Sequence, residues 1–284
     1  CLQLVSKTSN IMSNLDVPKI LELAKNAGIA DDDRENLIWF ALGCADGARN
    51  ADSKAPVQLL GAAVSANVVP VWTLLESAGI PHEFKPVDLL SGEHKGEEFL
   101  SLNPYHTVPT IKHGDFTLHE SSAILRYIVR AFPSVASKFY GNGDIQKQAI
   151  IDAALDERQS SIYKKIAAIL YPFIGFAPKQ SEENVEKNVA ALNETLATFE
   201  SHFLKHGKFV AGDHPSIADL SIGIPVLALR ATPYWTKLSE GIRTWATSVD
   251  TALPAVEKIF DGATNGQNFG GKQFIGMRAA TYDA

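Results

Sequence analysis

Cysteine is scarce in this chain, whose 284 residues include only Cys1 and Cys44. A disulfide framework and a Cys-rich zinc site are therefore not expected, and a reducing compartment fits best. Long apolar runs are also missing, since none approaches the roughly 20 residues of a membrane-spanning helix. The net charge of -6 lacks the basic excess typical of nucleic-acid-binding proteins. The sequence therefore predicts no membrane span and no nucleic-acid partner. A small anionic ligand remains compatible with the net charge, because a local cluster of positive charge can bind it.

The first 52 residues are predicted to form a helical extension. Apolar residues share one helix face between Leu15 and Ala24 and again between Leu37 and Ala41. Short helices need a surface to pack on, so the extension either covers the body of the same chain or docks a protein partner. Because the chain starts with Cys, we expect a processed or truncated N-terminus. The expected location is the cytoplasm, with an organelle as the alternative.

Residues 53–138 show the pattern of a small α/β domain. A strand–helix–strand unit of this length implies a right-handed crossover between parallel strands. Two further short strands joined by a Gly turn form a hairpin, and a helix opening on Ser follows. The order β-α-β-β-α predicts a mixed four-stranded sheet. The expected elements are strands at 57–61, 82–87, 110–112 and 116–118, and helices at 68–78 and from Ser121 onwards.

Residues 144–284 are predicted to form an all-α domain, with long helices at 146–173 and 181–206. A capping box at Ser216 and Asp219 predicts the start of a third helix. That helix is almost entirely apolar through Leu229, so it should be the core of the domain. The glycine-rich tail from Gly262 is predicted to be coil.

Two signatures resemble the glutathione S-transferase family. The stretch Asn103-Pro, Val108-Pro109 and Glu120-Ser121 resembles the second half of that family's N-terminal domain. The later G-x-x-x-S-I-A-D, ending at Asp219, resembles its folding motif. The resemblance covers roughly residues 56 to 260 and is closest to the theta-like enzymes with a catalytic Ser. It implies a thioredoxin-like domain followed by a helical domain, glutathione as co-substrate and a homodimer.

Ser65 is the predicted catalytic residue. Glutathione reacts as the thiolate, which hydrogen-bond donors near a helix N-terminus favour. The resemblance places such a donor just before the first helix of the α/β domain, where Ser65 carries the only hydroxyl. Ser65 could instead only cap that helix. The theta-like pattern continues with Pro and then Arg, whereas this chain has Ala66 and Asn67. The missing Arg removes a supporting charge, and Asn67 is a further candidate donor to sulfur.

The same resemblance predicts how the peptide part of glutathione is held. Val108-Pro109 looks like the family's cis-proline element, in which the Val108 backbone would pair with the cysteinyl unit of glutathione. Glu120 would bind the α-ammonium group, and Ser121 at the helix start would bind the α-carboxylate. The alternative is that Ser121 only caps the helix beside an exposed Glu120, but this does not explain its combination with Val108-Pro109.

Two histidines are candidates for the glycyl carboxylate of glutathione. His94 lies in a loop that resembles the theta-type loop, and His106 stands where the family often has Lys; each could also be a solvated surface residue. The histidine spacing predicts no metal site. An electrophile pocket is expected between the domains, although core packing is the default for its possible walls, namely Tyr163, Ile166, Tyr171 and Phe176.

The sequence thus predicts a glutathione transferase that joins the glutathione thiolate to a small hydrophobic electrophile. A glutathione-dependent dehalogenase, isomerase or peroxidase is a related option. The alternative from another class is a non-catalytic subunit of the same fold that acts as an assembly module in a protein complex. The extension, the missing Arg and the incomplete-looking start favour this alternative, whereas the retained Ser65 favours the enzyme.

Overall fold

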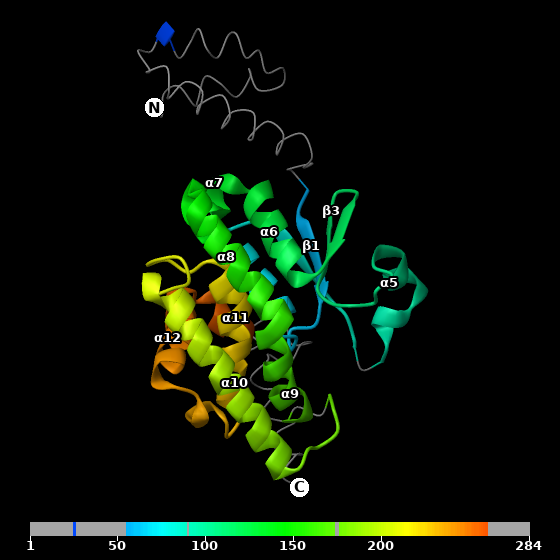
Figure 1. Ribbon diagram of the computed structural model, residues 1–284. Helices are drawn as coiled ribbons and strands as arrows, with labels where there is room; N and C mark the ends of the chain where they lie inside the picture. The colour runs from blue at the N-terminus through cyan, green and yellow to red at the C-terminus, as the bar shows by residue number, and fades with distance from the viewer. Residues whose placement is uncertain (1–24, 27–54, 90, 174–175, 261–284) are drawn as a thin grey trace. The chain divides into compact units, whose positions relative to one another are not determined.

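The computed structural model describes residues 25–26, 55–89, 91–173 and 176–260 (Figure 1). The chain divides after Ala55, and the unit that begins at Pro56 is described by itself. Apart from Lys25 and Asn26, the predicted extension lies outside the described residues, as does the predicted coil from Gly262.

The second unit begins with strands and helices in alternation and continues with helices. Its elements are β1 (Val57–Gly61), α4 (Val68–Ser77), β2 (His82–Pro86), α5 (Glu97–Leu102), β3 (Thr110–His113), β4 (Phe116–His119), α6 (Ser121–Ala131), α7 (Pro133–Ala136), α8 (Ile145–Glu157), a π-helical turn (Arg158–Ile162), α9 (Tyr163–Phe173), α10 (Glu182–Phe203), α11 (Ile217–Ala228), α12 (Glu240–Ala252) and α13 (Ala255–Phe260).

The sheet is mixed, with the strand order β2-β1-β3-β4. β1 pairs with β2 in parallel, and β3 pairs antiparallel with both β1 and β4. Val57 and Leu59 of β1 are fully buried, while Gln58 and Leu60 are only partly covered, as the period of a strand requires. The predicted mixed four-stranded, thioredoxin-like sheet is confirmed, and a short helix that the predicted β-α-β-β-α order did not include, α5, lies between β2 and β3.

Helices α4 and α6 join the sheet to the helical domain. Both contact each other and α11, and α4 also contacts α13. The buried face of α4 is formed by the apolar side chains of Val68, Val71, Leu74 and Leu75, so one continuous core runs from the sheet into the helices. In Figure 1 the short helix α5 lies on the far side of the sheet from this helical domain.

The helix predicted over residues 146–173 is helical from Ile145 to Phe173, but it contains a π-helical turn that the prediction did not include. Between α8 and α9 the chain makes one π-helical turn, in which the Tyr163 N–H donates to the carbonyl of Arg158. A π turn inserts an extra residue and shifts the phase of the side chains. Arg158 consequently points inward and is 1% exposed. Apolar residues continue with helical spacing on both sides of the turn, so the sequence pattern did not reveal it.

The capping box predicted at the start of α11 is present. The Asp219 N–H donates to Ser216 Oγ at 3.4 Å, and the Ser216 N–H donates to Asp219 Oδ2 at 2.8 Å. Asp219 is fully buried and also accepts from the Val210 N–H at 3.1 Å and from Trp245 Nε1 at 2.9 Å. Burial raises the pKa of the Asp219 carboxyl, while these hydrogen bonds favour its charged form. The carboxyl therefore ties the loop before α11 to α12.

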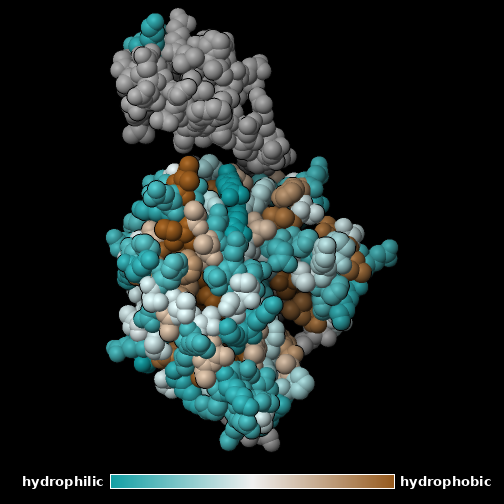
Figure 2. Space-filling view, in the orientation of Figure 1, coloured by the Kyte–Doolittle hydropathy of each residue, from teal (hydrophilic) through white to brown (hydrophobic). Residues whose placement is uncertain are grey.

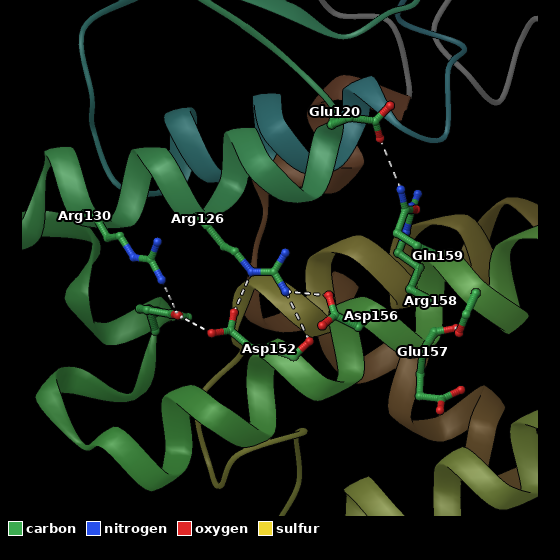
Figure 3. Close-up of polar contacts among 10 residues, drawn as sticks. Glu120, Arg126, Arg130, Asp152, Asp156, Glu157, Arg158 and Gln159 are labelled. Atoms are coloured by element: carbon green, nitrogen blue, oxygen red, sulfur yellow. Dashed lines mark hydrogen bonds and ion pairs between the residues drawn. The ribbon is translucent and has the colours of Figure 1, made fainter.

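An ion-pair cluster holds α6 against α8 (Figure 3). Arg126 Nε donates to Asp152 Oδ1 at 2.6 Å, and Arg126 Nη2 donates to Asp156 Oδ1 at 2.8 Å. The second oxygen of Asp152 accepts from the Tyr140 hydroxyl at 2.6 Å, and that hydroxyl accepts from Arg130 at 3.0 Å. The cluster fixes the start of α6, and so the Glu120-Ser121 pair, relative to the helical domain.

The surface is largely polar. The face seen in Figure 2 is a mosaic of hydrophilic side chains with separate small hydrophobic patches. None of the helices in the described ranges combines the length and the apolar content needed to cross a lipid bilayer.

Candidate active site

A cavity of about 400 Å³ lies between the sheet domain and α9. All of the residues predicted to bind or activate glutathione line it, namely Ser65, His94, His106, Val108, Pro109, Glu120 and Ser121. Tyr163, Tyr171 and Phe176 form part of its wall, whereas Ile166 is buried in the core and does not reach it. Residues that are widely separated in the sequence are thus gathered around one hollow.

Ser65 stands in the turn between β1 and α4. Its Oγ accepts from the Asn67 N–H at 3.3 Å, and its carbonyl accepts from the Val68 N–H at 3.0 Å. The bond to the Asn67 N–H named in the capping alternative is therefore present, although the N-cap position of α4 is Asn67 itself. The Ser65 O–H proton remains available, because the hydroxyl is used only as an acceptor in this bond. Gly61 allows the turn to approach α4 closely, since a Cβ there would lie 2.7 Å from the Val68 methyl groups.

The Val108-Pro109 peptide bond is cis, as the resemblance implied. The preceding loop is held by Asn103, whose fully buried amide donates to the Thr107 carbonyl at 2.9 Å and to Thr110 Oγ1 at 3.0 Å. In the described part of the chain, neither the N–H nor the C=O of Val108 has a backbone partner. Both groups are left for a ligand that adds to this edge as a strand does.

Glu120 and Ser121 meet at the start of α6. Glu120 has φ = 70°, which is unusual for a residue with a side chain and is typical of functional sites. Its carboxylate is exposed and accepts from Gln159 Nε2 at 3.2 Å (Figure 3). Ser121 is buried and is the first residue of the helix, so its backbone N–H lies at the positive end of the α6 dipole. An ammonium group and a carboxylate attached to the same carbon atom, as in an α-amino acid, fit this pair of residues.

His94 and His106 both line the cavity and lie close to each other. Their ring centroids are 6.2 Å apart, and His94 Nδ1 is buried without a hydrogen-bond partner among the described residues. Burial, with the charges of Lys95 and His106, lowers the pKa of His94. His106 has φ = 46°, a further strained backbone position at this site.

A buried arginine that the sequence analysis did not single out lies behind Asn67. Arg158 donates to Asn67 Oδ1, and its Nε donates to the Ser221 carbonyl at 2.8 Å. Burial lowers the pKa of Arg158 to about 10, so it stays cationic at neutral pH. The π turn thus brings a positive charge into contact with Asn67, two residues after Ser65. The sequence signal for Arg158 was weak, because a single Arg between two helical segments usually faces solvent.

The network continues from Asn67 to two tyrosines. Asn67 Nδ2 donates to the Tyr163 hydroxyl at 2.9 Å, which lies 2.6 Å from the Tyr171 hydroxyl. The Arg158 guanidinium also lies 4.5 Å from the centre of the Tyr163 ring. Burial raises the pKa of Tyr163, so its hydroxyl is a neutral hydrogen-bonding group.

Known proteins show the same architecture. Residues 64–131 match the family described as the N-terminal domain of glutathione S-transferase. Glutathione S-transferase 1 of Zea mays is 31% identical over 212 residues, which are 72% of this chain and 96% of that protein. Human glutathione S-transferase theta-1 is 33% identical over 154 residues, or 53% of this chain and 63% of that protein.

A solved structure agrees with these relatives. Glutathione S-transferase I from maize, in complex with an atrazine–glutathione conjugate, superposes with a TM-score of 0.63 at 30% identity, covering 72% of this chain and 96% of that one. Fold and site define a thioredoxin-like domain joined to a helical domain, with one cavity lined by residues of both. This chain belongs to the glutathione S-transferase family. It is a transferase with glutathione as its co-substrate, and the predictions of family, fold, activity and co-substrate are confirmed.

Proposed function

We propose that this cavity conjugates glutathione to small electrophiles, with Ser65 stabilising the attacking thiolate. One observation carries the proposal: the Ser65 hydroxyl, the Val108 backbone and the Glu120-Ser121 pair all line one cavity. In the reaction the thiol proton leaves to solvent, and the sulfur lone pair forms a bond to an electrophilic carbon. The electron pair of the bond broken at that carbon leaves with a leaving group or moves onto an adjacent acceptor.

The sulfur is placed by the turn before α4. The Ser65 oxygen is occupied by the Asn67 N–H, so its own proton is directed to another acceptor, and a thiolate in the cavity is suited to that role. The start of α4 contributes the positive end of its dipole. Arg158, acting through Asn67, adds a positive charge without contacting the sulfur. These three contributions favour the charged form of the thiol.

The peptide is held at both ends. We assign the α-ammonium group to Glu120, the α-carboxylate to Ser121 and the start of α6, and the cysteinyl backbone to Val108 beside Pro109. The glycyl carboxylate is assigned to His94 and His106, which also line the cavity. This arrangement matches each charge of glutathione with an opposite charge or a donor.

Calorimetric titration of the full chain with glutathione tests the proposal. Binding at millimolar concentration or tighter, followed by conjugation of benzyl chloride, is the expected result. If glutathione does not bind while the chain forms a stoichiometric complex with another protein, the assembly-module alternative is correct. A variant lacking residues 1–52 shows in the same experiment whether a protein partner docks on the extension.

Glutathione affinity is expected to rise as the pH falls, because of His94. The low pKa of His94 leaves its ring neutral at neutral pH, and a bound carboxylate favours the protonated ring. Binding therefore takes up a proton, and each unit by which the ligand raises that pKa strengthens binding by up to about tenfold at low pH. Calorimetry with S-methylglutathione, which has no titrating thiol, checks this between about pH 8 and about pH 5.5.

The variant His94→Gln should lose most of this pH dependence, and His82→Gln, at a half-buried histidine outside the cavity, should keep it. If the affinity of His94→Gln changes with pH as in the wild type, while the affinity of His106→Gln does not, the carboxylate contact is assigned to His106 alone.

A homodimer and a cytoplasmic location are proposals as well. The family resemblance supports the homodimer, and the low cysteine content supports a reducing compartment. Light scattering across a concentration series measures the oligomeric state, and a monomer at every concentration would contradict the homodimer.

A further inference from the structure

Gln159, in the π-helical turn, is hydrogen-bonded to two side chains of opposite charge and lines the cavity. Its Oε1 accepts from Arg158 Nη1, and its Nε2 donates to Glu120 Oε2 at 3.2 Å (Figure 3). A guanidinium can only donate, so the atom of Gln159 that faces Arg158 must be the amide oxygen. The amide nitrogen then faces Glu120. Gln159 is therefore oriented as a donor to that carboxylate.

Arg158 is a fixed anchor for this orientation. Its side chain is 1% exposed, and its other two guanidinium nitrogens donate to the Ser221 carbonyl at 2.8 Å and to Asn67 Oδ1. All three nitrogens are thus bound in the interior, so the side chain cannot turn away without leaving buried groups unpaired. The positive charge of Arg158 also interacts favourably with the Glu120 carboxylate. The helical domain consequently holds Glu120 through Gln159.

The Glu120 carboxylate depends on this contact for its orientation. The side chain is exposed, and in the described ranges Gln159 is its hydrogen-bond partner. A free glutamate side chain loses rotamer freedom when it binds a ligand, and that loss weakens binding. Gln159 occupies only Oε2, so Oε1 stays available to accept from a ligand. The carboxylate is therefore held in one orientation, with one oxygen open, before a ligand arrives.

We infer that Gln159 is a positioning residue for the thiol co-substrate: it presents the Glu120 carboxylate to the α-ammonium group, and so makes the enzyme select thiol peptides that carry this amine. The inference rests on the proposed assignment of the ammonium group to Glu120. The contact is made equally in the bound thiol peptide and in the transition state, because the ammonium group does not react. It should therefore lower KM for the thiol without raising kcat.

The test compares glutathione with glutaryl-Cys-Gly, which has the same carboxylates and thiol but lacks the α-amine. Both are assayed at saturating benzyl chloride with wild type and with Gln159→Met, whose side chain is of similar length but has no amide. We expect KM for glutathione to rise by about tenfold at nearly unchanged kcat, and kcat/KM for glutaryl-Cys-Gly to change by less than about twofold. Gln146→Met, at an exposed residue near the start of α8, is the matched control and should leave both values unchanged.

A double-mutant cycle shows whether Gln159 acts through Glu120. Glu120→Gln should lose most of the preference for glutathione over glutaryl-Cys-Gly. Adding Gln159→Met to Glu120→Gln should then have no further effect on this preference, because the carboxylate that Gln159 orients is gone. Thermal unfolding shows whether each variant is folded, and the ratio of the two peptides is measured on the same protein sample.

Equal losses with the two peptides in Gln159→Met, or a loss with neither, would overturn the role of Gln159. So would a fall in kcat at unchanged KM, which would place Gln159 at the sulfur instead. A wild type that conjugates both peptides equally well would overturn the inference as well, with the conjugating activity unaffected. Failure of the wild type to bind glutathione and to conjugate benzyl chloride would instead overturn the proposed function.

Discussion

Replacing Ser65 by alanine is expected to lower kcat for conjugation by about 10²-fold, with little change in glutathione affinity. The hydroxyl is lost, but the residues assigned to the peptide charges lie elsewhere in the cavity. Without its donor the thiol pKa rises towards the roughly 8.5 of a free thiol, so the remaining activity should recover as the pH is raised. A pH–rate profile of wild type and variant, measured with benzyl chloride, checks the result.

The variant Ser65→Asp distinguishes a catalytic role of Ser65 from a role as a helix cap alone. Aspartate accepts from the Asn67 N–H as well as serine does, so the cap is kept. Its carboxylate cannot donate to a thiolate and repels it. If Ser65 activates sulfur, both variants lose activity; if Ser65 only caps, Ser65→Asp retains it. A fully active Ser65→Asp would therefore refute the catalytic assignment.

Most of the fold was readable from the sequence because its local signals agree with one another. The strands around Val57 and Thr110 are short runs with apolar residues, and glycine or proline marks the turns that follow them. The Ser216-Asp219 box marks the start of α11. The π turn at Arg158 could not be read, since one additional residue within a helix leaves the apolar spacing on each side intact.

The candidate site was readable only in part. Ser65, Val108 and Ser121 could be named because the stretches around them resemble motifs of the glutathione S-transferase family. Arg158 could not, because its role depends on burial and on its contact with Asn67, 91 residues away along the chain. The missing Arg after Ser65 was readable from the sequence, whereas the positive charge that Arg158 brings to Asn67 from another element was not.

The variant Asp219→Ala is expected to have the largest effect on stability, lowering the free energy of unfolding by about 3–5 kcal/mol. The substitution removes the acceptor of the Val210 N–H, the Ser216 N–H and hydroxyl, and the Trp245 indole N–H, all in the interior. Of these donors, only the Ser216 hydroxyl can rotate towards another acceptor. Urea denaturation followed by tryptophan fluorescence, which reports on Trp245, measures the change.

Asp213→Ala is the matched control, because Asp213 is exposed in the same loop and should shift stability by less than about 0.5 kcal/mol. Asp219→Asn keeps the volume and one acceptor oxygen, so its loss should be intermediate. An Asp219→Ala variant as stable as the control would show that the buried hydrogen bonds do not hold α11.

The effect of Asp219 should extend to catalysis. Arg158 is anchored on the carbonyl of Ser221, two residues into α11 from Asp219, and Arg158 in turn orients Asn67 beside Ser65. Loosening the first turn of α11 should therefore lower kcat for conjugation even at temperatures where Asp219→Asn remains folded. The capping box would then support the hydrogen bonds that run from the Ser221 carbonyl through Arg158 to Asn67. A folded Asp219→Asn variant with wild-type kcat would show that the capping box stabilises the fold without affecting catalysis.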